Sequence, residues 1–391
     1  MSLLSVINGL LVFAMIYLLA TSVVLLRNRF ELTALREPNG YENQPRISIC
    51  IPARNEEQNI ERLLKSLLQQ EYKNFEILVL DDHSEDNTAA IVKSLATEHP
   101  DLLQFHTGEK KPEDWLGKPW ACHQLGKLAS GDLILFLDAD TSLHPDTVAK
   151  ISSSFREDQM HMLTVWPQQR LRTFWEKTVI PLVYYALVTL LPAIYVYRDP
   201  RWMPKPFRNK FRTAFSAACG QCLAFKREAY EAIGGHESVK ENIVEDVELA
   251  KLIKKAGFRI RMYHGVETVQ CRMYENEKAM FNGFRKNFLA GFGYSVPLFL
   301  IAALLHLVVF VLPFFVIPFA WYHIYEQLFF LSAASVGIIL LHRLILSIWF
   351  RWDPVHAFTH PVGVLWFQRL GIRVLFDYFS GTKPDWKGRK V

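Results

Sequence analysis

An uninterrupted apolar run that ends in two carboxylates constrains this chain more than any other feature. Residues 133–137 read Leu-Ile-Leu-Phe-Leu, and Asp138 and Asp140 follow directly. A strand without polar side chains is typical of a mainly parallel sheet that is covered on both faces. Ligands of open α/β sheets collect at the carboxyl ends of such strands. We therefore expect Asp138 and Asp140 to hold Mg²⁺ or Mn²⁺, which neutralises a diphosphate.

Two earlier strands also end in residues suited to a binding site. Residues 47–52 and 75–80 are largely apolar, and a helix is expected over residues 59–69 between them. The residues of interest after these strands are Ala53, Arg54, Glu56, Asp81 and Asp82. This alternation of strands and helices predicts a right-handed, nucleotide-binding α/β sheet. An Asx turn that closes the strand is the alternative explanation for the Asp138 to Asp140 triplet.

These motifs together resemble those of the family 2 glycosyltransferases, whose nucleotide-sugar-binding fold is called GT-A. The matching segments follow the family order within residues 47–290. They are Ile51–Glu56, Asp81–Asp86, Trp115–Ala121, Asp138–Asp140 and Glu245–Asp246. The resemblance implies an α/β, Rossmann-like GT-A domain with flanking transmembrane helices. The chain is most similar to members that modify lipids, namely carotenoid enzymes of the diaponeurosporenoate type, hopanoid-associated enzymes and ceramide glucosyltransferases.

The resemblance implies a donor pocket for a uridine diphosphate sugar. Asp81 is expected to accept hydrogen bonds from the nucleoside, and Lys118 to meet the diphosphate as a compact point charge. Asp138 and Asp140 are the expected metal ligands, with Asp140 the direct one. The residues expected to line the nucleotide pocket are Ala53, Arg54 and Glu56. Glu56 has an alternative role as a carboxylate favoured by a helix dipole, and Lys118 has one as a solvated lysine.

The resemblance also implies a general base. Asp246 would take the proton from the acceptor hydroxyl in a single displacement that inverts configuration, and Glu245 would support it. Acidic residues at a helix start are also common for structural reasons. Arg272, Arg285 and Lys286 are expected either to close over the leaving diphosphate or to mark the membrane boundary. The Q-x-x-R-W motif of the processive synthases of this family does not occur, which argues against a polymerising enzyme.

Three apolar runs are long enough to cross a bilayer. They are residues 3–26, 296–321 and 328–350. A cleaved signal peptide is disfavoured for the first run, because basic residues follow it rather than precede it. The connector 322–327 has no Lys or Arg, so the positive-inside rule predicts that the connector lies outside and the central domain in the cytosol. His342 and Arg343 lie within the last run and are expected to face protein or to snorkel, in a packing or a functional role.

Two further segments are expected at the membrane surface. Residues 361–380 alternate apolar and basic positions at helical spacing, as in an interfacial helix. Residues 178–197 are uncharged, are interrupted by Pro181 and Pro192, and contain tyrosines typical of a lipid interface. We expect this insert to lie in the membrane plane and to guide the acceptor, with a buried core helix pair as the alternative. The net charge of +5 and the absence of nucleic-acid motifs predict no nucleic-acid partner.

The predicted domains follow from these assignments. They are an N-terminal transmembrane helix (1–27), a linker (28–46), a cytosolic GT-A catalytic domain (47–294) with the membrane-associated insert 178–197, two transmembrane helices (295–350), and an amphipathic interfacial helix with a basic tail (351–391). The predicted function is transfer of a sugar from a nucleotide-sugar donor, UDP-linked, to a membrane lipid or isoprenoid acceptor. The alternatives are a metal-dependent nucleotidyltransferase, whose usual glycine-rich first loop is replaced here, and a non-catalytic membrane scaffold.

Overall fold

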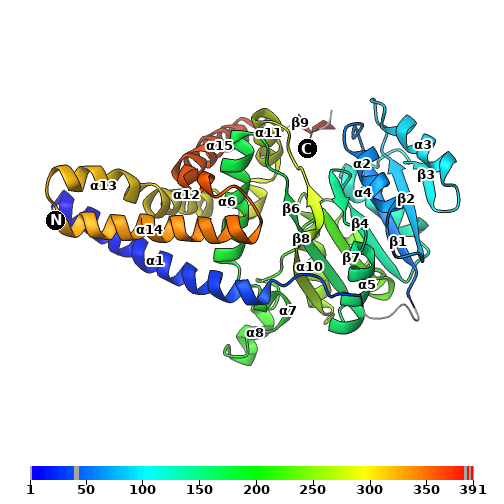
Figure 1. Ribbon diagram of the computed structural model, residues 1–391, viewed down its shortest axis with the longest axis horizontal. Helices are drawn as coiled ribbons and strands as arrows, with labels where there is room; N and C mark the ends of the chain where they lie inside the picture. Colours follow the sequence, from blue (N-terminus) through cyan, green and yellow to red (C-terminus); the bar gives the residue numbers. More distant parts are fainter. Residues whose placement is uncertain (1, 39–43, 383–384, 387–388, 391) are drawn as a thin grey trace. The chain divides into compact units, whose positions relative to one another are not determined.

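The computed structural model describes residues 2–38, 44–382, 385–386 and 389–390. The chain divides into two compact units (Figure 1). The sheet unit comprises Leu32–Arg170 and Ala193–Met273. The helical unit draws on Met1–Glu31, Leu171–Pro192 and Tyr274–Val391. The chain therefore starts in the helical unit and enters the sheet unit at Leu32. It leaves the sheet unit for residues 171–192, returns to it for residues 193–273, and ends in the helical unit.

An eight-stranded mixed sheet forms the centre of the sheet unit in the order β3-β2-β1-β4-β7-β6-β8-β5. Its strands are β1 Ile47–Ala53, β2 Phe75–Asp81, β3 Leu103–Thr107, β4 Leu133–Leu137, β5 Thr141–Leu143, β6 Met162–Gln169, β7 Cys222–Lys226 and β8 Ile260–Cys271. Strands β3, β2, β1 and β4 are mutually parallel, whereas β7 runs antiparallel to β4. The parallel half places the carboxyl ends of β1, β2 and β4 at one edge of the sheet.

Helices cover the sheet because its central strands are apolar on both faces. Every residue of β2 and β4 is buried, as predicted for a doubly covered parallel strand. Helix α2 buries Ile60, Leu63, Leu64 and Leu67 against this core, at the spacing of one helix face. The helices of this unit are α2 Ile60–Leu68, α3 Thr88–Glu98, α4 Gly117–Leu128, α5 Thr147–Asp158, α7 Ile194–Tyr197, α8 Lys205–Phe211, α9 Arg227–Ala232, α10 Glu245–Lys255 and the 3₁₀ helix η1 Gly235–Val239.

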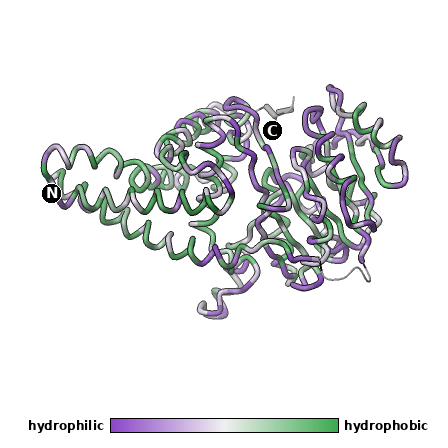
Figure 2. The backbone as a smooth tube through the Cα atoms, viewed as in Figure 1, coloured by the Kyte–Doolittle hydropathy of each residue, from purple (hydrophilic) through white to green (hydrophobic). Residues whose placement is uncertain are grey.

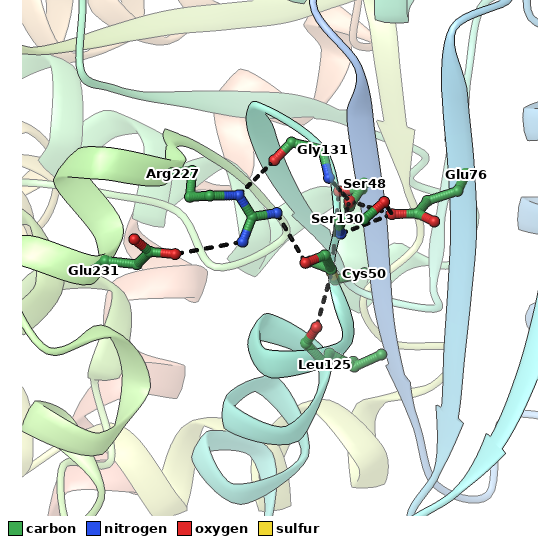
Figure 3. Close-up of polar contacts among 9 residues, drawn as sticks. Ser48, Cys50, Glu76, Leu125, Ser130, Gly131, Arg227 and Glu231 are labelled. Atoms are coloured by element: carbon green, nitrogen blue, oxygen red, sulfur yellow. Dashed lines mark hydrogen bonds and ion pairs between the residues drawn. The ribbon is translucent and has the colours of Figure 1, made fainter.

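A buried polar network holds the turn that leads into β4 (Figure 3). The Glu76 carboxylate accepts hydrogen bonds from the Ser48 hydroxyl at 2.6 Å and from the Ser130 amide and hydroxyl at 2.9 and 2.7 Å. Arg227 donates to the Gly131 and Ala129 carbonyl oxygens, both at 2.8 Å. These bonds tie the start of β4 to β1 and β2. They help to set the register in which β4 delivers Asp138 to the opposite edge.

The helical unit contains long apolar helices (Figure 1). Its elements are α1 Leu3–Glu31, α6 Phe174–Leu190, α11 Glu277–Asn287, η2 Ala290–Phe292, α12 Val296–Phe310, α13 Leu312–Tyr322, α14 Glu326–Trp349, η3 Pro354–Thr359, α15 His360–Ser380, and the short strands β9 Asp385–Trp386 and β10 Arg389–Lys390. Among the described residues, three helical stretches are long and apolar enough to span a membrane: Leu3–Glu31, Val296–Tyr322 and Glu326–Trp349. Figure 2 shows hydrophobic residues dominating these stretches.

The boundaries differ from the predicted ones where side chains tie helices together. Helix α1 continues to Glu31, into the expected linker, and the Asn28 amide donates to the carbonyl oxygens of Val188 and Leu191 at 2.9 and 2.7 Å. These bonds satisfy carbonyl groups at the end of α6, which belongs to the helical unit. Residues 274–294, expected in the catalytic domain, also group with the helices.

The insert 178–197 corrects two local expectations. Helix α6 runs through Pro181 instead of ending there, because its packed face outweighs the loss of one backbone hydrogen bond. Tyr184 and Tyr185, expected at a lipid interface, are buried inside the helical unit, where α6 contacts α1, α14 and α15.

The expected single span 296–321 is two helices, which meet at Val311 just before Pro313. Proline there lacks the N–H that a continuous helix needs.

The network at the start of β4 generates a stability prediction. Burial favours protonation of Glu76, but hydrogen bonds from Ser48 and Ser130 and the charge of Arg46 outweigh it and hold its pKa below the ordinary value. Its stabilising contribution is therefore present above the unfolded-state pKa and is lost as the pH falls through the folded-state pKa. Glu76→Gln should destabilise the sheet unit by about 1–3 kcal/mol at neutral pH, since it leaves buried donors unsatisfied.

The measurement is the midpoint of thermal unfolding of the detergent-solubilised chain at pH 7. Glu231→Gln is the matched control, because Glu231 belongs to the same network but its side chain is 63% exposed. Its 3.5 Å ion pair with Arg227 should contribute little. Equal midpoints for the two variants would contradict a stabilising role for Glu76.

Candidate active site

The ends of the parallel strands bring the predicted donor residues to one edge of the sheet. Ala53 and Asp81 are the last residues of β1 and β2, and they lie opposite each other in register. Asp138 follows β4, whose Phe136 pairs with Cys50 of β1. The carboxylates of Asp81 and Asp138 therefore come from β2 and β4, the two strands that flank β1, at the same end of the sheet. This edge is where ligands bind in open α/β sheets.

Arg54 shapes the loop after β2. Its guanidinium donates to the Asp82 and His83 carbonyl oxygens at 2.6 and 2.9 Å. Asn55 adds reciprocal bonds, since its amide N–H donates to the Ser84 hydroxyl at 2.9 Å and its side-chain oxygen accepts from the Glu85 amide at 2.8 Å. The loops after β1 and β2 are thus tied to each other. This contact gives Arg54 a structural role, and its expected contact with a nucleotide stays a prediction.

Asp81 and Glu56 both contact backbone or side-chain donors in these loops. The buried Asp81 carboxylate accepts from the Ser84 amide at 3.3 Å. The Glu56 amide donates to the Thr88 hydroxyl at 2.7 Å, and the Glu56 carboxylate accepts from Asn59 at 3.1 Å. Glu56 therefore lies near the start of α2, in agreement with the alternative of a carboxylate that the helix terminus favours.

Lys118 joins two acidic residues from different elements. It is the second residue of α4, and its ammonium lies 2.7 Å from the Asp138 carboxylate and 3.2 Å from that of Glu245. Glu245 and Asp246 begin α10, where the helix dipole favours negative charge. Burial alone would lower the pKa of Lys118, but Asp138 and Glu245 hold it well above the usual value. Lys118 is therefore a permanent cation at the centre of this cluster.

Two backbone amides orient Asp246. Its carboxylate oxygens accept from the Gly220 and Val247 amides, each at 2.8 Å. A side chain at Gly220 would begin 3.0 Å from the Lys118 ammonium and 3.5 Å from the Asp246 carboxylate, so a larger residue would crowd the ammonium but not the carboxylate. Burial and the neighbouring charge of Glu245 raise the pKa of Asp246 to about 7, against the opposing effect of Lys118. Asp246 is thus a carboxyl group able to gain or lose a proton near neutral pH.

Backbone contacts fix the loop that carries Asp138 and Asp140. The Asp138 amide donates to the Gln221 carbonyl oxygen at 3.2 Å, and the Asp140 carbonyl oxygen accepts from Arg62 at 3.1 Å and from the Arg272 amide at 3.3 Å. In the part of the chain that the structure describes, no group of three or more His, Cys, Asp or Glu side chains is arranged to hold a metal. Two hard carboxylates suit Mg²⁺ or Mn²⁺, which take their remaining ligands from phosphate and water.

The structure separates the predicted arginines. Arg272 follows β8 and adjoins the Asp140 loop through its backbone. Arg285 lies in α11 of the helical unit, where its guanidinium pairs with Asp377 of α15. The expected contact of Arg285 with a diphosphate therefore stays a prediction. Sequence reasoning missed Gly220 and Gln221, although the small-residue run before β7 is a signal for close backbone approach.

Comparisons with known proteins find similarity to glycosyltransferases. A family model described as Glycosyl transferase family 2 matches residues 48–234, and one described as Glycosyl transferase family 21 matches residues 208–349. The 4,4'-diaponeurosporenoate glycosyltransferase of Staphylococcus haemolyticus is 28% identical over 288 residues, which cover 70% of this chain and 69% of that protein. The Staphylococcus aureus enzyme of the same name is 28% identical over 273 residues, which cover 68% and 66%.

A solved structure shows the same fold. The mannosyltransferase PcManGT from Pyrobaculum calidifontis, in complex with GDP-Man and Mn²⁺, matches with a TM-score of 0.54. The match has 18% sequence identity and covers 95% of this chain and 99% of that chain. The α/β GT-A fold predicted from the sequence is therefore confirmed.

Proposed function

Because the chain belongs to the family 2 glycosyltransferases, we propose that it is a metal-dependent, inverting enzyme that moves a sugar from a nucleotide-sugar donor to a membrane lipid. The observation that carries the proposal is the orientation of Asp246 by two backbone amides, next to a cationic Lys118 that also contacts Asp138. This arrangement combines a base with the charges that a diphosphate leaving group requires. The nucleotidyltransferase and the scaffold have no comparable observation in their favour.

Asp246 acts as the general base in this proposal. A carboxylate with a pKa of about 7 is matched to proton transfer at neutral pH. It takes the proton of the acceptor hydroxyl as the oxygen attacks the anomeric carbon and the bond to the diphosphate breaks. The Gly220 and Val247 amides keep the carboxylate in one orientation, which reduces the reorganisation needed during the reaction. Glu245 maintains the position of Lys118 through their ion pair.

The donor side uses the edge formed by β1, β2 and β4. Asp138 and Asp140 would hold a divalent cation, which would supply positive charge to the diphosphate. Lys118 supplies a second positive charge at the same place. The pocket for the nucleoside is formed by Ala53, Arg54, Glu56 and Asp81. Arg272 adjoins the loop of Asp140 through its backbone amide. We propose a UDP-linked sugar as the donor, on the basis of the family resemblance.

The acceptor is a membrane lipid or isoprenoid in this proposal. The relatives from Staphylococcus are named for a carotenoid acid, diaponeurosporenoate, as their acceptor. The three apolar helical stretches are compatible with attachment of this chain to a bilayer, where such an acceptor resides. The connector between α13 and α14 has no Lys or Arg, so the catalytic unit faces the cytosol by the positive-inside rule.

Substitution of the metal ligand tests the donor side. Asp140→Asn should reduce transfer by about 10²-fold or more, because the amide is a poorer ligand and the diphosphate charge stays uncompensated. Release of nucleoside diphosphate in proteoliposomes with Mg²⁺ or Mn²⁺ is the measurement. Asp101→Asn, at an exposed carboxylate of the same unit, is the control and should retain activity. Full activity of Asp140→Asn, or of the wild type in excess chelator, would exclude the metal role.

Substitution of the base separates chemistry from binding. Asp246→Asn should retain nucleotide and metal affinity but lose transfer by about 10²- to 10⁴-fold, since no group takes the acceptor proton. Donor affinity by calorimetry and transfer rate are measured together. Glu248→Gln, in the first turn of the same helix, is the matched control for charge loss at the α10 terminus. An equal loss of nucleotide affinity in Asp246→Asn would reassign this residue to the donor pocket.

The raised pKa of Asp246 predicts the pH dependence. The base works only when deprotonated, so kcat/KM should fall about tenfold per pH unit below about pH 7. Transfer rates from pH 5 to pH 8 test this, with donor affinity measured over the same range to identify any loss of binding. A value of kcat/KM that stays constant from pH 5 to pH 8 would contradict the assignment.

A further inference from the structure

The interior of the helical unit contains a polar cluster that the proposed reaction does not use. Tyr185 of α6, His342 and Arg343 of α14, and His360 of α15 are its members, and we call them the Arg343 cluster. The exposed fraction is 4% for Tyr185, 2% for His342 and 1% each for Arg343 and His360. Three separate helices therefore contribute ionisable or polar groups to one buried region. Such groups inside apolar helices are costly and usually functional.

Part of the Arg343 cluster is fully hydrogen-bonded. The two ring nitrogens of His342 contact the Ser22 hydroxyl at 2.7 Å and the Tyr185 hydroxyl at 2.9 Å. The Tyr185 ring lies 5.2 Å from the His360 ring, centroid to centroid, and Phe310 lies at the same distance from His360. These contacts fix His342 and Tyr185 and form an aromatic wall beside His360. They explain the burial of His342 without any ligand.

The burial of Arg343 and His360 is not explained by such hydrogen bonds. The Arg343 guanidinium donates from Nη2 to the His356 carbonyl oxygen at 3.0 Å, whereas its Nε and Nη1 have no partner among the described residues. Both ring nitrogens of His360 are likewise without a partner in the described part of the chain. A buried guanidinium without a counter-ion costs several kcal/mol in proteins generally. The chain thus concentrates unpaired polar nitrogens, with the Arg343 donors among them, where no described carboxylate contacts them.

We propose that the Arg343 cluster binds the oxyanion headgroup, a carboxylate or a phosphate, of an anionic amphiphile. An arginine guanidinium has the planar set of donors that such groups accept from, and His360 adds a further donor beside it. The apolar surroundings favour a ligand whose remainder is hydrocarbon, since the Phe310 ring of α12 lies 5.6 Å from the Tyr185 ring and 5.2 Å from the His360 ring. The site is defined by the helical unit alone, so the inference does not rest on the proposed function.

Binding to the full chain in neutral detergent micelles tests the proposal. The probes are palmitate, palmitoyl lysophosphatidate, monopalmitoylglycerol and inorganic phosphate, which separate headgroup charge from the hydrocarbon chain. We expect saturable binding of about one palmitate or lysophosphatidate per chain, with at least tenfold weaker binding of the neutral lipid. Preference between the two anionic lipids identifies the headgroup as carboxylate or phosphate. Equal affinity for the neutral lipid, or binding of inorganic phosphate as tight as that of either anionic lipid, overturns the proposal.

Variants locate the binding. Arg343→Gln should weaken binding of the anionic lipid at least tenfold, and His360→Gln should weaken it while retaining the arginine charge. The second variant keeps the test decisive if the first fails to fold. Arg27→Gln is the matched control, because the Arg27 side chain is 58% exposed in the same unit and should leave affinity unchanged. Unchanged affinity in a folded Arg343→Gln variant, or in His360→Gln if the former does not fold, overturns the assignment.

Discussion

The ion pairs of Lys118 make the candidate active site physically possible. Asp138, Glu245 and Asp246 come from two distant parts of the sequence, and three carboxylates gathered at one sheet edge repel one another. Lys118 lies 2.7 Å from Asp138 and 3.2 Å from Glu245, and its charge also acts on Asp246. The start of α10 and the Gly220 amide add positive dipoles. The same arrangement therefore keeps the Lys118 ammonium among the carboxylates, where the diphosphate of the proposed donor would meet a positive charge.

The position of Asp138 in this cluster depends on contacts at the start of β4, at the opposite edge of the sheet. Glu76, Ser48 and Ser130 hold the turn before β4, and Arg227 adds bonds to the same turn (Figure 3). Because a strand is stiff, fixing its start also limits where its last residue lies. The backbone of Asp138 then donates to the Gln221 carbonyl oxygen and accepts from the Thr141 amide, each at 3.2 Å. Asp138 lies in the loop after β4, whereas Lys118 and Asp246 lie in the first turns of α4 and α10.

The two units solve the burial of polar groups in different ways. In the sheet unit, charged groups at the strand ends neutralise one another through ion pairs and backbone amides. In the helical unit, Asn28 donates to carbonyl groups at the C-terminal end of α6, and Tyr185 and Ser22 satisfy both nitrogens of His342. Arg343 and His360 are among the exceptions, and their unpaired nitrogens are the basis of the proposed headgroup site.

Local sequence patterns determined the element types of this protein and its fold family. Apolar runs predicted β1, β2 and β4, carboxylates at their ends predicted the functional edge, and long apolar stretches predicted the three candidate membrane spans. These features can be read from a short window of sequence, because the spacing of apolar side chains within it indicates which residues are buried. Only the tertiary structure decided that Gly220 faces Lys118 and Asp246, that Arg285 pairs with Asp377, and that Tyr185 meets His342. Such pairs lie far apart in the chain, and their meeting depends on the packing of whole helices and strands rather than on any local pattern.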